Sequence, residues 1–165
     1  KGENMNMLSW KQKCLWFGTG LLWGLALAAA TGIWFLRTSL IEEKESALPY
    51  KQAVQLFPQQ VLRQSGWTLR TVPCGLPVQE TGKRITVFEI CSRKYAGKIL
   101  NDPDSRKTAA VLPCKIAIYE RNGRTYFARL NAAVFMRLLG GTAAEVFGQG
   151  ILPEQTAMLY GLLRD

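Results

Sequence analysis

Four cysteines are the side chains of this sequence with the widest chemical scope. Cys14 begins a long apolar run, whereas Cys74, Cys91 and Cys114 lie well beyond it. No two of the four have the C-x-x-C spacing of thioredoxin-like enzymes or of haem c attachment sites. A Cys74–Cys91 disulfide, a soft-metal site made by the three thiols, and unreactive thiols therefore stay open as alternatives.

The positions of these cysteines add two expectations. Cys91 ends one predicted strand and Cys114 begins another, so antiparallel pairing of those strands would bring the two thiols close together. Cys114 follows a proline at a strand start and is expected to be a small buried hydrophobe. Cys14, at the edge of the apolar run, is an inert thiol or, alternatively, a palmitoylation site.

Apart from the cysteines, the sequence offers few residues or motifs for catalysis or metal binding. The sequence has no histidine, which removes the usual general base near neutral pH and the commonest zinc ligand. It also lacks the G-x-S-x-G, H-E-x-x-H and phosphate-loop motifs. Glu89 and Glu120 make a conceivable carboxylate pair, although charged strand residues usually face solvent. We therefore expect no catalytic centre, no cofactor and no metal.

The segment Cys14–Leu36 predicts a transmembrane helix. Its 23 residues carry no charge, and at about 1.5 Å per residue they span a hydrocarbon core about 30 Å thick. One alternative is a cleaved signal peptide, because Ala28-Ala29-Ala30 resembles a cleavage site. The other is a buried core helix, which the length and the lack of polar residues disfavour. Apolar residues continue beyond that site, so we expect an uncleaved anchor preceded by a tail at residues 1–13.

Small residues recur at every fourth position of this segment, at Gly20, Gly24, Ala28 and Gly32. Such a line lets another helix approach closely, and it predicts packing against a transmembrane helix of another subunit. The flanking charges favour a cytoplasmic N-terminus, since two lysines precede the segment and one arginine directly follows it. The C-terminal domain is then expected in the periplasm, at the inner membrane of a bacterium.

The chain is basic, with a formal net charge of +9 at pH 7. The excess is concentrated in residues 67–129, where twelve Lys and Arg accompany five acids. A basic domain beside a membrane predicts an anionic partner, such as an acidic extramembrane protein face or the lipid bilayer. A merely solvated basic surface is the alternative. The basic residues are scattered without interleaved aromatics, so we expect no nucleic-acid partner.

Beyond the anchor, residues 37–48 read as a charged linker and residues 49–165 as one α+β domain. In the first half of the domain we expect a helix at 49–64 that Pro58 kinks or splits, strands at 67–72 and 84–91 separated by a turn-rich loop at 73–77, and a helix at 93–100 capped by Ser92. A hairpin of strands 115–120 and 124–130 around Asn122-Gly123 and a helix from Asn131 to Gly140 follow. The last expected features are a capping box at Thr142 and Glu145 and a helix from Pro153 whose Met158, Leu159, Leu162 and Leu163 form a core stripe. This order predicts a small antiparallel sheet with helices on one face.

Three stretches of the predicted domain carry a family resemblance. They are VFEICSRKYAGKIL at 87–100, the Asp102-Pro103 break, and LPCKIAIYERNGRTYFARLN at 112–131. In their order and spacing, residues 66–163 resemble the domain-of-unknown-function family 302. The resemblance implies a sandwich related to the TATA-binding-protein-like β-α-β-β-β-β-α arrangement, and a tendency to dimerise. It implies no reaction, and this chain departs from the family pattern by its membrane anchor and by Cys91.

These observations favour a non-catalytic accessory subunit of a larger bacterial membrane complex, in a respiratory or redox setting. In this hypothesis the anchor packs on a partner helix and the domain docks on an extramembrane subunit. The alternative is a membrane-tethered ligand-binding or thiol-redox module that uses Cys74, Cys91 or Cys114.

Overall fold

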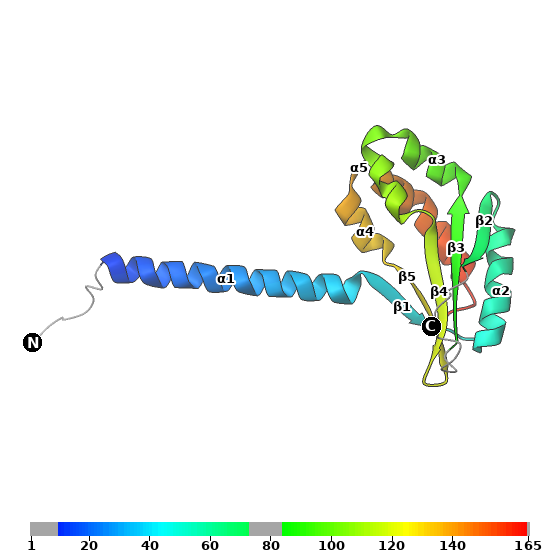
Figure 1. The fold of residues 1–165 in the computed structure, drawn as a ribbon, viewed down its shortest axis with the longest axis horizontal. Helices are drawn as coiled ribbons and strands as arrows, with labels where there is room; N and C mark the ends of the chain where they lie inside the picture. Colours follow the sequence, from blue (N-terminus) through cyan, green and yellow to red (C-terminus); the bar gives the residue numbers. More distant parts are fainter. Residues whose placement is uncertain (1–9, 73–83, 165) are drawn as a thin grey trace, which may run out of the picture. The chain divides into compact units, whose positions relative to one another are not determined.

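The computed structural model describes residues 10–72 and 84–164, and it divides into two units at residues 38 and 39. The first unit is formed by α1 (Trp10–Ser39), a single helix of 30 residues (Figure 1). Within α1, Cys14–Ser39 has a mean hydropathy of 1.6 and is long and apolar enough to cross a membrane. Its described side chains are almost all exposed, as expected of a helix whose apolar surface meets lipid.

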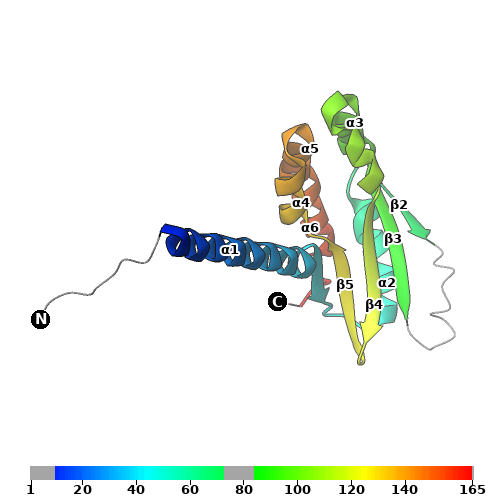
Figure 2. The same cartoon turned by 60° about the vertical axis from the view of Figure 1, so that its left-hand side comes forward.

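The second unit is an α+β domain built on one five-stranded antiparallel sheet (Figures 1 and 2). The strands lie in the order β1-β5-β4-β3-β2, and every neighbouring pair is antiparallel. The predicted fold class is therefore confirmed. In chain order the elements are β1 (Ile41–Glu45), α2 (Tyr50–Arg63), β2 (Trp67–Val72), β3 (Ile85–Ser92), α3 (Arg93–Asn101), the 3₁₀ helix η2 (Pro103–Val111), β4 (Cys114–Arg121), β5 (Arg124–Leu130), α4 (Ala132–Leu139), α5 (Gly141–Val146), the π-helical turn η3 (Phe147–Ile151) and α6 (Leu152–Leu159).

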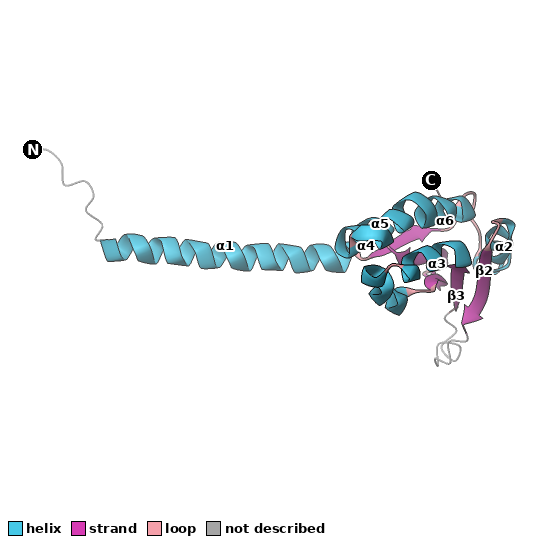
Figure 3. Cartoon of the chain, turned by 90° about the horizontal axis from the view of Figure 1, so that it is seen from above, coloured by secondary structure: helices cyan, strands magenta, loops and turns pink. Residues whose placement is uncertain are grey.

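The hydrophobic core lies between one face of this sheet and the helices, which gather beside the strands in Figure 3. Phe57 of α2 is fully buried, and its ring centroid lies 5.4 Å from that of Phe88 and 5.9 Å from that of Phe127. Met158 and Leu159 of α6 are buried in the same cluster. The stripe predicted at the C-terminal end is thus core, although its Leu162 lies beyond the end of α6.

A buried polar junction ties the sheet edge to the helices. The Trp67 indole N–H and the Tyr95 hydroxyl both donate hydrogen bonds to the Glu154 carboxylate. Trp67 and Tyr95 are only 6% and 7% exposed, so Glu154 satisfies two donors that water barely reaches. The hydrogen bond to Glu154 is the main reason that the pKa of Tyr95 is raised, and burial adds to it.

The β4–β5 hairpin forms as the sequence predicts. Asn122 and Gly123 are its two loop residues, with φ angles of 53° and 73°, as a primed turn requires. Directly after β5, the Asn131 side chain accepts hydrogen bonds from the N–H groups of Ala133 and Val134, which confirms it as the cap of α4. These local signals set the register of the two strands that carry most of the site below.

The interval predicted as a linker contains a strand instead. Ile41–Glu45 forms β1, which pairs with β5 at one edge of the sheet. Glu42, Glu43 and Glu45 give this segment the composition of a linker. In the structure they form ion pairs with arginines that are distant in sequence, namely Arg129, Arg121 and Arg124, respectively. With β1 included, the domain follows the β-α-β-β-β-β-α order that the family resemblance implies, except that α3 and η2 are inserted between β3 and β4.

Four smaller expectations differ from the structure. The α2 helix contains Pro58 and is not split there. Ser92 precedes α3, but its side chain makes no capping hydrogen bond. The predicted box at Thr142 and Glu145 fails because α5 already begins at Gly141. The last helix starts one residue before Pro153 and continues directly from η3. The loop predicted at 73–77 lies outside the described residues.

Candidate functional site

The face of the sheet that points away from the hydrophobic core is the candidate site, and we call it the open face. Among the described residues, none of its side chains belongs to the core cluster that α2, α3 and α6 cover. Strand alternation and register place one small apolar residue on each of four adjacent strands, in a row across this face. The row consists of Val72, Val87, Ala117 and Ala128, which are all half-buried.

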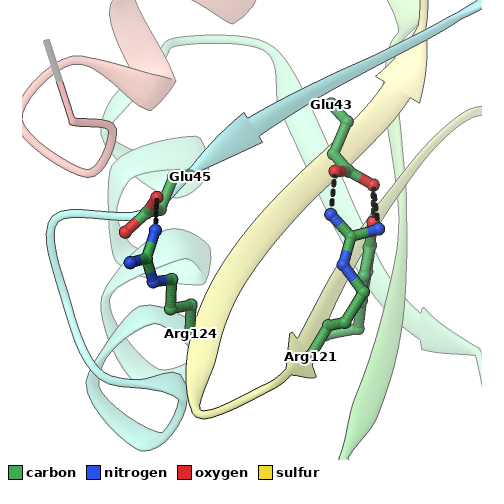
Figure 4. A network of polar contacts seen from close by, with 5 residues as sticks. Glu43, Glu45, Arg121 and Arg124 are labelled. Atoms are coloured by element: carbon green, nitrogen blue, oxygen red, sulfur yellow. Dashed lines mark hydrogen bonds and ion pairs between the residues drawn. The ribbon is translucent and has the colours of Figure 1, made fainter.

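An aromatic and charged cluster borders one side of this row. Tyr119 and Tyr126 are cross-strand neighbours whose rings stack at 5.8 Å with an interplanar angle of 26°. The Arg121 guanidinium lies 4.5 Å from the centroid of the Tyr126 ring. It also donates to both carboxylate oxygens of Glu43, at 2.6 and 3.2 Å, as Figure 4 shows. Bidentate pairing and ring stacking hold this arginine in one position on the surface.

Hydrogen bonding within the cluster shifts the pKa values of its members. The Tyr119 hydroxyl donates to Glu43, and this bond, helped by Arg121, holds the pKa of Glu43 below its usual range despite some burial. Burial, together with the same hydrogen bond and the Glu43 charge, raises the pKa of Tyr119 to about 12. At neutral pH the pair is therefore an ionised carboxylate and a neutral phenol.

Ion pairs border the other side of the row. Glu89 of β3 lies between two basic residues on neighbouring strands, with Arg70 at 2.6 Å and Lys115 at 3.9 Å. On the tyrosine side, at the hairpin end, Glu45 pairs with Arg124 at 3.3 Å (Figure 4) and with Arg164 at 2.6 Å. The open face therefore carries alternating charges of both signs around an apolar centre.

The basic excess of the domain lies elsewhere. The segment formed by α3 and η2 exposes five basic side chains and contains two acids, Asp102 and Asp104. The basic residues are Arg93, Lys94, Lys98, Arg106 and Lys107. The basic excess that composition shows is thus concentrated on this segment, whereas the charges of the open face are close to balanced.

The three predicted thiols are not gathered into one site by the described residues. Strands β3 and β4 do pair antiparallel, but Cys114 stands opposite Ile90, so Cys91 and Cys114 leave opposite faces of the sheet. Both are free thiols, and Cys74 lies outside the described residues. Burial raises the pKa of Cys114 to about 11, although a hydrogen bond with Gln155 opposes this shift. At neutral pH Cys114 is thus a protonated, weakly nucleophilic thiol.

The remaining candidates are placed as follows. Cys14 is exposed near the start of α1. Glu89 and Glu120 do not face one another, because Glu120 pairs with Arg84 at 3.5 Å while Glu89 stands opposite Lys115. Across residues 10–72 and 84–164, no group of three acidic or thiol side chains is arranged to hold a metal. On α1, the positions of Gly20, Gly24 and Gly32 have open space where a Cβ would lie.

Sequence reasoning missed the cluster of Glu43, Tyr119, Arg121 and Tyr126, although half of it was accessible. Once Asn122-Gly123 is taken as a two-residue turn, the register places Tyr119 opposite Tyr126. The contribution of Glu43 had no local signal, because it comes from a strand 76 residues earlier in the chain.

Fold and face together define a small α+β domain with one open sheet face, joined to a helix capable of spanning a membrane. The chain belongs to the family described as Domain of unknown function DUF302, which matches residues 43–149. No curated protein matches the sequence. A similar solved structure is that of an uncharacterized conserved DUF302 protein from Bacillus stearothermophilus, with 18% identity and a TM-score of 0.61, covering 74% of this chain and 98% of that one. This likeness supports the fold.

Proposed function

We propose that this chain is a membrane-anchored accessory subunit whose domain binds another protein through the open face of its sheet. The observation that carries the proposal is the apolar row on that face, at Val72, Val87, Ala117 and Ala128. A contiguous apolar strip with a polar border is the usual composition of a protein-binding surface. Its small side chains leave room for the side chains of a partner to approach the sheet.

The border of the row favours a protein as the partner. Tyrosine and arginine are enriched where interfaces derive most of their binding energy, and Arg121 is already held between Glu43 and the Tyr126 ring. Acidic side chains at Glu43, Glu45 and Glu89 are interspersed with the basic ones, and they would repel a uniformly anionic surface such as a lipid headgroup layer. A partner with charges of both signs matches this border best.

In this proposal α1 is an uncleaved membrane anchor with a cytoplasmic N-terminus, and the domain lies in the periplasm. The apolar span Cys14–Ser39 supports the anchor, and the flanking lysines support its direction. The strip of Gly20, Gly24, Ala28 and Gly32 would pack against a helix of the same complex. There would then be two contacts with the complex, one in the membrane and one outside it. Formation of either contact would raise the effective concentration of the partner surface at the other contact.

Purification of the full-length chain from its native membranes tests this function. Solubilised in a mild neutral detergent and separated by size, the chain should leave the column together with at least one different chain in a fixed ratio. A clean monomer, or a complex that contains only copies of this chain, would contradict the accessory role. The companion chain is identified by mass spectrometry of the same fractions.

A further inference from the structure

Arg129 of β5 is a buried cation whose hydrogen bonds are incomplete. It stands opposite Ile116 in the sheet, so its side chain enters the core side, where it is 11% exposed. Its Nε donates to Glu42 at 2.9 Å. Its Nη1 is buried, and among the residues that the structure describes it has no hydrogen-bond partner. Buried polar atoms are nearly always paired, so this one indicates a missing acceptor.

The charges around Arg129 also favour a bound acceptor. Glu42 is shared between Arg129 and Lys44, whose Nζ lies 3.4 Å from the same carboxylate group. Lys44 is half exposed, so water screens its charge, whereas the nearly buried guanidinium of Arg129 has this one carboxylate as its ion-pair partner among the described residues. Burial tends to raise the pKa of Glu42, but the hydrogen bond and charge of Arg129 outweigh this and lower it. Glu42 is therefore ionised at neutral pH, and its single charge is shared between the two cations.

A small pocket beside Arg129 has the size and lining for the missing acceptor. Its volume is about 20 Å³, which is enough for one water-sized species. No carboxylate lines it, and its polar side chains are those of Arg129, Lys115, Cys114 and Gln155. Gln155 is 5% exposed and can offer its amide N–H₂ to an occupant. The rest of the wall is apolar, from Val111, Leu130, Ala132, Phe135 and Phe147.

We infer that this pocket binds one small monovalent anion of about the size of chloride, held by the Arg129 guanidinium and the Gln155 amide. The anion completes the hydrogen bonds of Nη1. It also links β5 to α6, which contributes Gln155. The pocket is too small for an organic acid with a side chain, so the ligand class is a simple inorganic ion.

Bromide provides the direct test, because it substitutes for chloride and scatters anomalously. In crystals of the full-length protein grown with sodium bromide, we expect an anomalous peak within hydrogen-bonding distance of Arg129 Nη1. Density at that position without anomalous signal would mean a water and would overturn the inference. The same holds if the Nη1 atom turns out to donate to a protein carbonyl.

Thermal unfolding of the full-length chain in neutral detergent gives an independent readout. At constant ionic strength, replacing gluconate with chloride should raise the unfolding midpoint by a few degrees, and this increase should level off at high chloride concentration. The Arg129→Gln variant should lose this dependence, whatever its own midpoint. Arg124→Gln, which also removes a partner of β1 but lies on the exposed hairpin, should keep it. Equal chloride dependence in the two variants would contradict the assignment.

Discussion

An arginine in place of Ala117 will weaken binding of the partner protein by about 100-fold or more and leave the domain folded. Ala117 lies at the centre of the open face, with Val87 and Ala128 as its neighbours on adjacent strands. A long charged side chain there would keep the partner away from the apolar row or be buried without a counter-charge. Either outcome costs about 3 kcal/mol of binding free energy, which corresponds to this loss in affinity.

The same substitution should change the free energy of unfolding by no more than about 1 kcal/mol, since the Ala117 side chain does not contribute to the core. Gln59→Arg is the matched control, because Gln59 is exposed on α2 and the change adds the same side chain. The measurement is the amount of companion chain that purifies with each variant. If Ala117→Arg retained the partner as well as Gln59→Arg does, the open face would not be the binding surface.

An alanine at Gly150 will produce the largest loss of stability among single-methyl changes in this domain. A Cβ at Gly150 would lie 2.3 Å from Cε1 of Tyr95, far inside any real contact distance. The Tyr95 ring cannot easily move aside, because its hydroxyl donates to Glu154 and the ring is buried beside Trp67. Overpacking of this kind costs about 3 kcal/mol, equivalent to a fall of about 10 °C in the unfolding midpoint.

Two other glycines provide the scale for this prediction. Gly97 lies within α3 with open space around its Cβ position, so Gly97→Ala should stabilise the domain by about 0.5–1 kcal/mol. At Gly148 the nearest atom is the flexible Met136 sulfur, 2.7 Å away, so alanine there should have an intermediate effect. Circular dichroism of thermal unfolding ranks the three. A Gly150→Ala midpoint equal to that of Gly97→Ala would show that the packing around Tyr95 is looser than described.

Local sequence signals predict this fold well wherever one short segment determines its own structure. The Asn122-Gly123 turn set the register of β4 and β5, and Asn131 marked the start of α4. The apolar run from Cys14 predicted the membrane-type helix. In each case a few adjacent residues are enough to determine the local structure. They do so by a turn with positive φ angles, by a side-chain acceptor at a helix start, or by a long stretch without charged residues.

Features that depend on distant partners were not predictable in this way. The segment of β1 reads as a solvated linker until Arg121, Arg124 and Arg129 are placed beside it. Arg129 itself occurs among alternating strand residues, and nothing local shows that it faces the core. The Glu154 junction joins residues 59 and 87 positions apart. Such contacts follow from the strand order in the sheet, which neither composition nor the resemblance over residues 66–163 predicted.

Site-specific photo-cross-linking tests most directly whether the open face binds another protein. A photoreactive residue at position 115, which is exposed on the open face, is compared with one at position 59 on α2, in full-length chains within native membranes. The account predicts one discrete cross-linked product with a different chain from position 115 and none from position 59. Equal labelling from both positions, or none from position 115 while position 59 reacts, would contradict it.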